Sequence, residues 1–194
     1  MRRTAGTFVT IAVALALALG DQVMLARVDV RVEFDKTFDF KPVQTWGWNP
    51  AGPGEIKMAR SKYDDPDAMK SKAEPWIVSA MATETASRGL RLATAAPDLT
   101  ATYYLLLTTN MSTQEMGQFL PSTVAWGIPP FAPATQSFTV MNRGSLVLDF
   151  SAGGKVVWRG VAQANVQTDA DDKRREKLLR EGVRDLLKKY PPGR

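Results

Sequence analysis

Residues 145–166, SLVLDFSAGGKVVWRGVAQANV, determine the fold class that we expect. Gly153 and Gly154 separate two β-rich segments, and glycine accepts the positive φ angles that tight hairpin turns require. On the returning segment, residues 155–166, apolar and polar side chains alternate almost completely, as in a half-buried strand. One face carries Val156, Trp158, Ala162, Ala164 and Val166, and the other carries Arg159, Gln163 and Asn165. The stretch therefore predicts an antiparallel β-hairpin.

Four further segments have the composition of strands. In residues 28–34 apolar side chains alternate with charged ones, and a β-rich run over residues 43–48 ends before Pro50. Residues 99–108 contain an unbroken apolar run, which predicts a strand that is covered on both faces. Residues 137–141 also have the composition of a strand.

Two segments have helical periodicity. Residues 75–88 start with Pro75, which suits the first turn of a helix, and finish with a basic residue and a glycine. Residues 171–190 repeat apolar side chains at helical spacing, with acids at the start and lysines at the end, in accordance with the helix dipole. The predicted fold class is therefore α+β, a twisted and mostly antiparallel sheet with two amphipathic helices packed on one face.

The second predicted helix carries a basic run at residues 173–175 that could form an anion-binding patch. The spacing of four residues also predicts ion pairs between Glu176 and Arg180 and between Asp185 and Lys189. These pairs favour a solvated charged face over an anion site.

Composition limits the chemistry that is available. The chain has 194 residues, 44% of them hydrophobic and 23% charged, which indicates one globular domain with a real core. It has no cysteine and no histidine, so disulfides, zinc clusters and Ser-His or Cys-His nucleophiles are excluded. The run Asp64-Asp65-Pro66-Asp67 lacks the glycine and the distal glutamate of a calcium loop, which favours a solvated turn. We expect no enzyme activity, no cofactor and no metal.

The N-terminus has the features of a secretory leader. Arg2 and Arg3 precede an uncharged apolar run that is shorter than the ~20 residues of a membrane span. We expect cleavage after Gly20, with cleavage after Ala26 as an alternative, and a single domain over residues 21–194. Loss of the two arginines reduces the 25 basic residues to 23 against 20 acidic, a net charge of +3 that is too mild to indicate nucleic acid. The expected location is the periplasm, with membrane attachment only if the leader is retained.

Several motifs together resemble the bacterial envelope family called domain of unknown function 4136, over nearly all of residues 28–192. They are Val32-Glu33-Phe34-Asp35, Phe38-Asp39-Phe40, Thr45-Trp46-Gly47-Trp48, residues 144–149, Val157-Trp158-Arg159-Gly160 and residues 186–192. The resemblance implies an α+β envelope domain without an established activity. Relatives of this kind resemble lipoproteins that are anchored through a cysteine directly after the leader. Here Asp21 stands at that position, so the anchor is excluded.

The predicted contact site is the proline-punctuated segment at residues 110–136. Its apolar side chains suit an adaptable contact with an envelope protein or an apolar ligand, and the alternative is that the segment packs over the open face of the sheet. The candidate contact residues are Met111, Met116, Phe119, Leu120, Trp126, Ile128 and Phe131. Trp158 and Gly160 are assigned structural roles, with Trp158 in the core and Gly160 allowing a close approach.

Two classes of function follow from these observations. We expect a non-catalytic periplasmic or secreted module that binds or assembles with other envelope components. The alternatives are an apolar-ligand carrier and a carboxylate-based envelope hydrolase, for which Asp149 is the available carboxylate. A strand aspartate next to a turn is, however, more typical of an edge charge or a turn acceptor.

Overall fold

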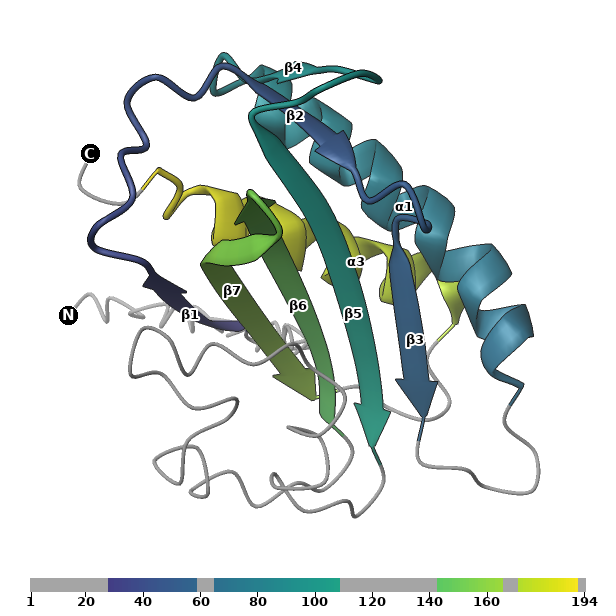
Figure 1. Cartoon of the computed structure of the whole chain (residues 1–194). Coiled ribbons are helices and arrows are strands. Elements are labelled where there is room, and N and C mark those ends of the chain that lie inside the picture. The colour runs from purple at the N-terminus through teal and green to yellow at the C-terminus, as the bar shows by residue number, and fades with distance from the viewer. Residues whose placement is uncertain (1–27, 59–64, 109–142, 166–170, 192–194) are drawn as a thin grey trace, which may run out of the picture.

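The computed structural model describes residues 28–58, 65–108, 143–165 and 171–191. These residues form one seven-stranded sheet and two helices, both of which lie behind the sheet in Figure 1. The elements are β1 (Asp29–Phe34), β2 (Thr45–Trp48), β3 (Gly54–Met58), α1 (Pro66–Ala86), β4 (Arg91–Leu92), β5 (Leu99–Thr108), β6 (Arg143–Ala152), β7 (Lys155–Asn165) and α3 (Asp172–Leu187). The predicted fold class is confirmed.

The long strands form the antiparallel part of the sheet. The order is β1-β7-β6-β5-β2-β4, and the pairs β1–β7, β7–β6 and β6–β5 are antiparallel. The β6–β7 hairpin turns at Gly153 and Gly154, whose φ angles are +55° and +77°, as the glycine pair predicted. The short strands β2, β3 and β4 pair in parallel, with β2 and β3 both on β5. The sheet is thus mixed at the edge where its short strands lie.

The prediction for the first helix was wrong about where it starts. Helix α1 begins at Pro66, so Pro75 lies in its interior rather than in its first turn. Asp65 is the N-cap, and its carboxylate accepts hydrogen bonds from the backbone N–H groups of Asp67 and Ala68. Of the solvated turn expected at residues 64–67, the described residues 65–67 are therefore a helix start. The preceding described element, strand β3, was also missed, because its five residues are too few to show a period.

Strand alternation gives the sheet two different faces. The face under the helices holds an aromatic core in which Trp158 contacts both Phe150 and Tyr190, with ring centroids 5.6 and 5.7 Å apart. The opposite face, which we call the second face, carries Leu106 and Val147, both fully buried. The prediction that residues 99–108 are covered on both faces is therefore confirmed by the burial of Leu105 and Leu106.

Three features predicted from the sequence lie outside the described residues. They are the leader at residues 1–20, the segment at residues 110–136 and the strand expected at residues 137–141. In the part of the chain that the structure describes, neither helix is both long enough and apolar enough to cross a membrane.

Candidate functional site

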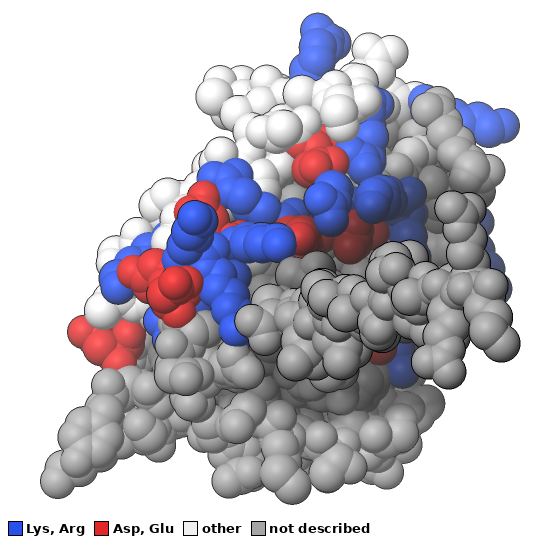
Figure 2. All heavy atoms as spheres, turned by 180° about the vertical axis from the view of Figure 1, so that it is seen from behind, with Lys and Arg blue, Asp and Glu red and all other residues white. Residues whose placement is uncertain are grey.

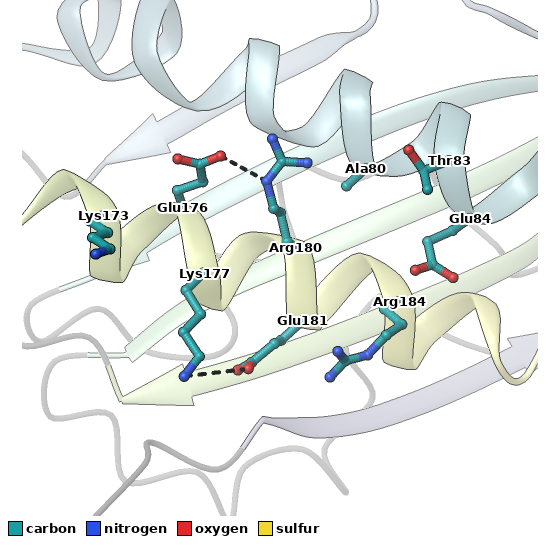
Figure 3. Close-up of a pocket in the computed structure, with 9 residues that line it drawn as sticks. All are labelled: Ala80, Thr83, Glu84, Lys173, Glu176, Lys177, Arg180, Glu181 and Arg184. Carbon is teal, nitrogen blue, oxygen red and sulfur yellow. Dashed lines mark hydrogen bonds and ion pairs between the residues drawn. The ribbon is translucent and has the colours of Figure 1, made fainter. Parts of the chain in front are cut away.

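The two helices run parallel and enclose a groove on the surface of the molecule. The contacts between them follow the same order along both helices. They run from Lys72–Asp172 through Ser79–Arg180 to Arg88, which donates to the carbonyl of Leu187. Ala80 and Thr83 are small side chains on the α1 side of the groove (Figure 3). The groove has a volume of about 440 Å³ and is shown in Figure 3. It is lined by Ala80, Thr83, Glu84, Lys173, Glu176, Lys177, Arg180, Glu181 and Arg184.

Charges of both signs form the walls of this groove. Arg180 donates to Glu176 over 2.8 Å (Figure 3). Arg180 also donates to the hydroxyl of Ser79 on α1 over 3.4 Å. Lys177 and Glu181 are 4.0 Å apart, and the side chain of Lys177 is 55% exposed. Such exposed pairs contribute little to stability, so a partner can replace them at small cost. The groove therefore suits a charged, hydrated partner surface better than an apolar small molecule.

The charged surface extends beyond the groove along the outer side of α3. Figure 2 shows Lys and Arg side chains interspersed with Asp and Glu across this side of the molecule. Near the start of α3, Lys72 of α1 lies 2.8 Å from Asp172, and this hydrogen bond holds the pKa of Asp172 below its usual value. Near its end, Lys188 lies 2.8 Å from Asp185. The helical layer thus presents a continuous surface of mixed charge.

The sequence predicted part of this ion-pair pattern. The pair of Glu176 and Arg180 is confirmed. The prediction of a pair between Asp185 and Lys189 is wrong, because Asp185 contacts Lys188 and Arg184 instead. Lys189 points to the sheet and donates to the carbonyl of Val30 over 2.9 Å. The groove was missed as a site because the helix periodicity does not show which α1 residues lie beside α3.

A second polar cluster lies buried on the second face of the sheet. Arg159 donates from Nε and from Nη2 to the two carboxylate oxygens of Asp149, each over 2.7 Å, and the side chains are 7% and 2% exposed. A second pair lies four residues away on each strand, where Gln163 donates to the hydroxyl of Ser145 over 3.2 Å. The antiparallel register places both pairs directly opposite each other across β6 and β7.

Burial controls the titration of this cluster. Loss of solvent raises the pKa of Asp149, and the hydrogen bonds and positive charge of Arg159 only partly offset the effect. Burial, followed by the negative charge of Asp149, raises the pKa of Tyr104 to about 12. The expectation that Asp149 is an edge charge or a turn acceptor was wrong, because β6 is a central strand and a bidentate arginine holds the carboxylate.

The residues to which the sequence assigned roles are distributed unevenly over the structure. Trp158 is fully buried in the aromatic core. A Cβ added to Gly160 would lie 2.6 Å from the Trp158 ring and 2.7 Å from Leu186, so α3 approaches the sheet closely at this position. The proposed contact residues Met111, Met116, Phe119, Leu120, Trp126, Ile128 and Phe131 all lie outside the described residues. Within the residues that the structure describes, no three carboxylates converge, so no metal-binding set is assigned.

Comparison with known proteins finds one family. The family model described as "Domain of unknown function (DUF4136)" matches residues 30–192. A search of curated proteins finds no match.

Solved structures that match the chain include three from bacteria. A PDZ domain protein from Parabacteroides distasonis is 13% identical, with a TM-score of 0.49 over 89% of this chain, and the chain spans 38% of its length. A DUF4136 family protein from Bacteroides thetaiotaomicron is 16% identical, with a TM-score of 0.47 over 84% of this chain and 96% of its own. A PelC dodecamer from Paraburkholderia phytofirmans is 9% identical, with a TM-score of 0.34 over 83% of this chain and 95% of its own.

Proposed function

The chain belongs to the DUF4136 family of unknown function, and we propose that it is a non-catalytic binding or assembly module of the bacterial cell envelope. The observation that carries this proposal is the groove between α1 and α3, together with the mixed charge that surrounds it. The partner in this proposal is another envelope component with a complementary charged surface.

The groove has the properties of a docking surface. Its walls belong to two helices that are packed on a sheet, so the positions of the charges are fixed by the core rather than by a loop. Lys177 and Arg184 project from α3 with side chains that are 55% and 47% exposed. Charges of this kind set the partner, the orientation and the association rate more than the affinity. Charge complementarity therefore selects the partner.

The expected leader supports the assignment to the envelope. It covers residues 1–20 and would deliver the chain to the periplasm. The apolar segment at residues 110–136 is a second candidate contact, and the carrier hypothesis depends on it. The hydrolase alternative depends on Asp149, whose two oxygens are both engaged by Arg159.

Affinity capture from envelope extract tests the proposal. The exported protein is compared with a variant carrying Lys177→Glu and Arg184→Glu in the groove. A matched control carries Lys36→Glu and Lys41→Glu, which make the same change in net charge on exposed residues outside the groove. We expect the wild type and the control to retain one common partner, identified by mass spectrometry, and the groove variant to lose it.

The opposite pattern would contradict the proposal. If the groove variant retained every protein that the wild type captures while remaining folded by circular dichroism, the groove would not be the docking surface. Hydrolysis of envelope polymers by the purified wild type, abolished by Asp149→Asn, would support the hydrolase alternative instead.

A further inference from the structure

Four cations of α3 follow one another along the groove at intervals of four, three and four residues. They are Lys173, Lys177, Arg180 and Arg184, which we call the cation row. At 3.6 residues per turn their positions lie within about 60° of arc on one face of the helix, and Glu176 and Glu181 flank them on opposite sides (Figure 3). With a rise of 1.5 Å per residue, the row is about 16 Å long and its positions are about 4.5–6 Å apart. The groove therefore contains an evenly spaced line of positive charge.

The cation row is more accessible than the carboxylates beside it. The side chains of Lys177, Arg180 and Arg184 are 42% to 55% exposed, whereas those of the three glutamates of the groove are 21% to 35% exposed. The outward surface of the groove is thus dominated by positive charge, although charges of both signs line it.

The cations of the row keep hydrogen-bond donors for a partner. Within the described part of the chain, Lys173 has no hydrogen bond or ion pair, and Lys177 Nζ is 4.0 Å from Glu181, too far for a hydrogen bond. Arg184 uses only Nε there, and Arg180 uses Nε and Nη1 but not Nη2. Lysine has three N–H donors and arginine has five, so each member of the row can also donate to an added carboxylate.

We propose that the groove docks an acidic amphipathic helix of its envelope partner, with one carboxylate opposite each member of the cation row. The inference rests on the proposed docking function and specifies the surface of the partner. On a helix, acidic side chains at intervals of four, three and four residues repeat the spacing of the row. In an extended segment, alternate side chains are about 7 Å apart, so three intervals span about 20 Å and fall out of step with the row.

Charge argues against a second copy of the chain as the occupant. The intervals of the row read the same in both directions, so a two-fold axis at its centre would place α3 antiparallel to α3 of the second copy. Each cation of the row would then face a cation, and Glu176 would face Glu181 of the second copy. Like charges across an interface oppose association, whereas an acidic helix provides the complementary pattern.

A nuclear magnetic resonance titration of the isotope-labelled exported protein with designed peptides tests the inference at low salt. The probe is an alanine- and glutamine-rich helical peptide of about 20 residues with four glutamates at the spacing of the row. The control peptide has the same composition, with its glutamates distributed around the helix, and circular dichroism establishes that both are equally helical. We expect the probe to shift the amide signals of residues 173–184. Its dissociation constant should be lower than that of the control by about tenfold or more, because only the probe can pair all four glutamates at once.

Variants of the protein locate the binding. Lys177→Glu with Arg184→Glu should abolish the shifts, because two members of the row then repel the probe. Lys36→Glu with Lys41→Glu changes the net charge equally on exposed residues outside the groove and should leave the shifts unchanged.

Three results would overturn the inference. They are no shifts at residues 173–184, equal affinity for the two peptides, and an oligogalacturonate with four carboxylates that shifts the same signals with the affinity of the probe. The last result would show that the groove binds any polyanion. The proposed docking function is tested separately, because a partner that the wild type captures and the groove variant loses would support it even if the probe fails to bind.

Discussion

The buried pair of Asp149 and Arg159 makes a prediction that can be tested by a double-mutant cycle. The pair lies at the centre of the second face, with side chains that are 2% and 7% exposed and two hydrogen bonds of 2.7 Å. Removing one member of the pair leaves the other buried without its bidentate ion-pair partner, which costs about 3–5 kcal/mol. Replacing both by apolar side chains of similar size is often nearly neutral. The two substitutions should therefore be strongly non-additive.

The variants are Asp149→Leu, Arg159→Met and their combination, and the assay is urea unfolding followed by circular dichroism. We expect each single variant to lose about 3–5 kcal/mol and the double variant to lose ~1 kcal/mol or less. Simple addition would instead give a loss of about 6–10 kcal/mol. A double variant that reaches this sum, or single variants that cost less than ~1 kcal/mol, would refute the description of the pair as a desolvated ion pair.

The pH dependence of the arginine variant gives an internal control. Without Arg159, burial alone acts on Asp149 and raises its pKa in the folded state above the value in the unfolded chain. A group with a raised folded pKa favours the folded state at low pH, so the stability difference between Arg159→Met and the wild type should shrink as the pH falls. Asp149→Leu has no such carboxyl, and its deficit should not shrink for this reason.

Four further predictions concern stability. Trp158→Ala should lower the free energy of unfolding by ~3–5 kcal/mol, because the side chain is fully buried, and a thermal melt measures the loss. Gly160→Ala should cost about 1–3 kcal/mol, because its Cβ would meet atoms at 2.6 and 2.7 Å; Gly182→Ala, with neighbours at 3.5 and 3.8 Å, should be tolerated in the same denaturant titration. The carboxylate of Asp98 accepts hydrogen bonds from the backbone N–H groups of residues 44 and 45 and from the residue-45 hydroxyl, which hold its pKa below the usual value. Its contribution to the stability of the folded state is complete above the unfolded pKa and disappears as the pH falls through the folded pKa. Asp98→Asn should therefore flatten the acid limb of a curve of stability against pH. Replacing residues 112–134 by a short Gly/Ser linker should unfold the domain if the segment covers the second face, because stability falls by about 25 cal/mol for each Å² of apolar burial that is lost. A domain that stays folded but loses its envelope partners in affinity capture would instead establish a binding loop.

The sequence predicts the strands and their pairing best where the hydrophobic period is long. The β6–β7 hairpin was predicted from the glycine pair and the alternation around Trp158, because a period of two over many residues defines a strand and its faces. The ion pair of Asp149 and Arg159 could not be read from this hairpin, because an unbroken ladder from the turn would place Asp149 opposite Trp158, and a register shift between Phe150 and Ser151 brings it opposite Arg159 instead. Its burial could not be read either, because burial depends on what covers the second face.

The sequence predicts less where tertiary contacts outweigh local preferences. Pro75 indicated a helix start, but the cap at Asp65 and the packing of α1 on the sheet keep the proline inside the helix. Lys189 has the spacing for an ion pair with Asp185, yet the carbonyl at the β1 edge is its partner. The groove depends on which residues of α1 lie beside α3, and this follows from the parallel packing of two helices that are far apart in sequence.

Photo-crosslinking in intact cells tests the proposed docking function most directly. A photoreactive amino acid replaces Thr83, an exposed residue that lines the groove, and in a parallel strain it replaces Lys41, an exposed residue outside the groove. We predict one discrete crosslinked product with another envelope component from position 83 and none from position 41. A protein that is present and folded but gives no product at position 83, or the same products at both positions, would contradict the proposed function.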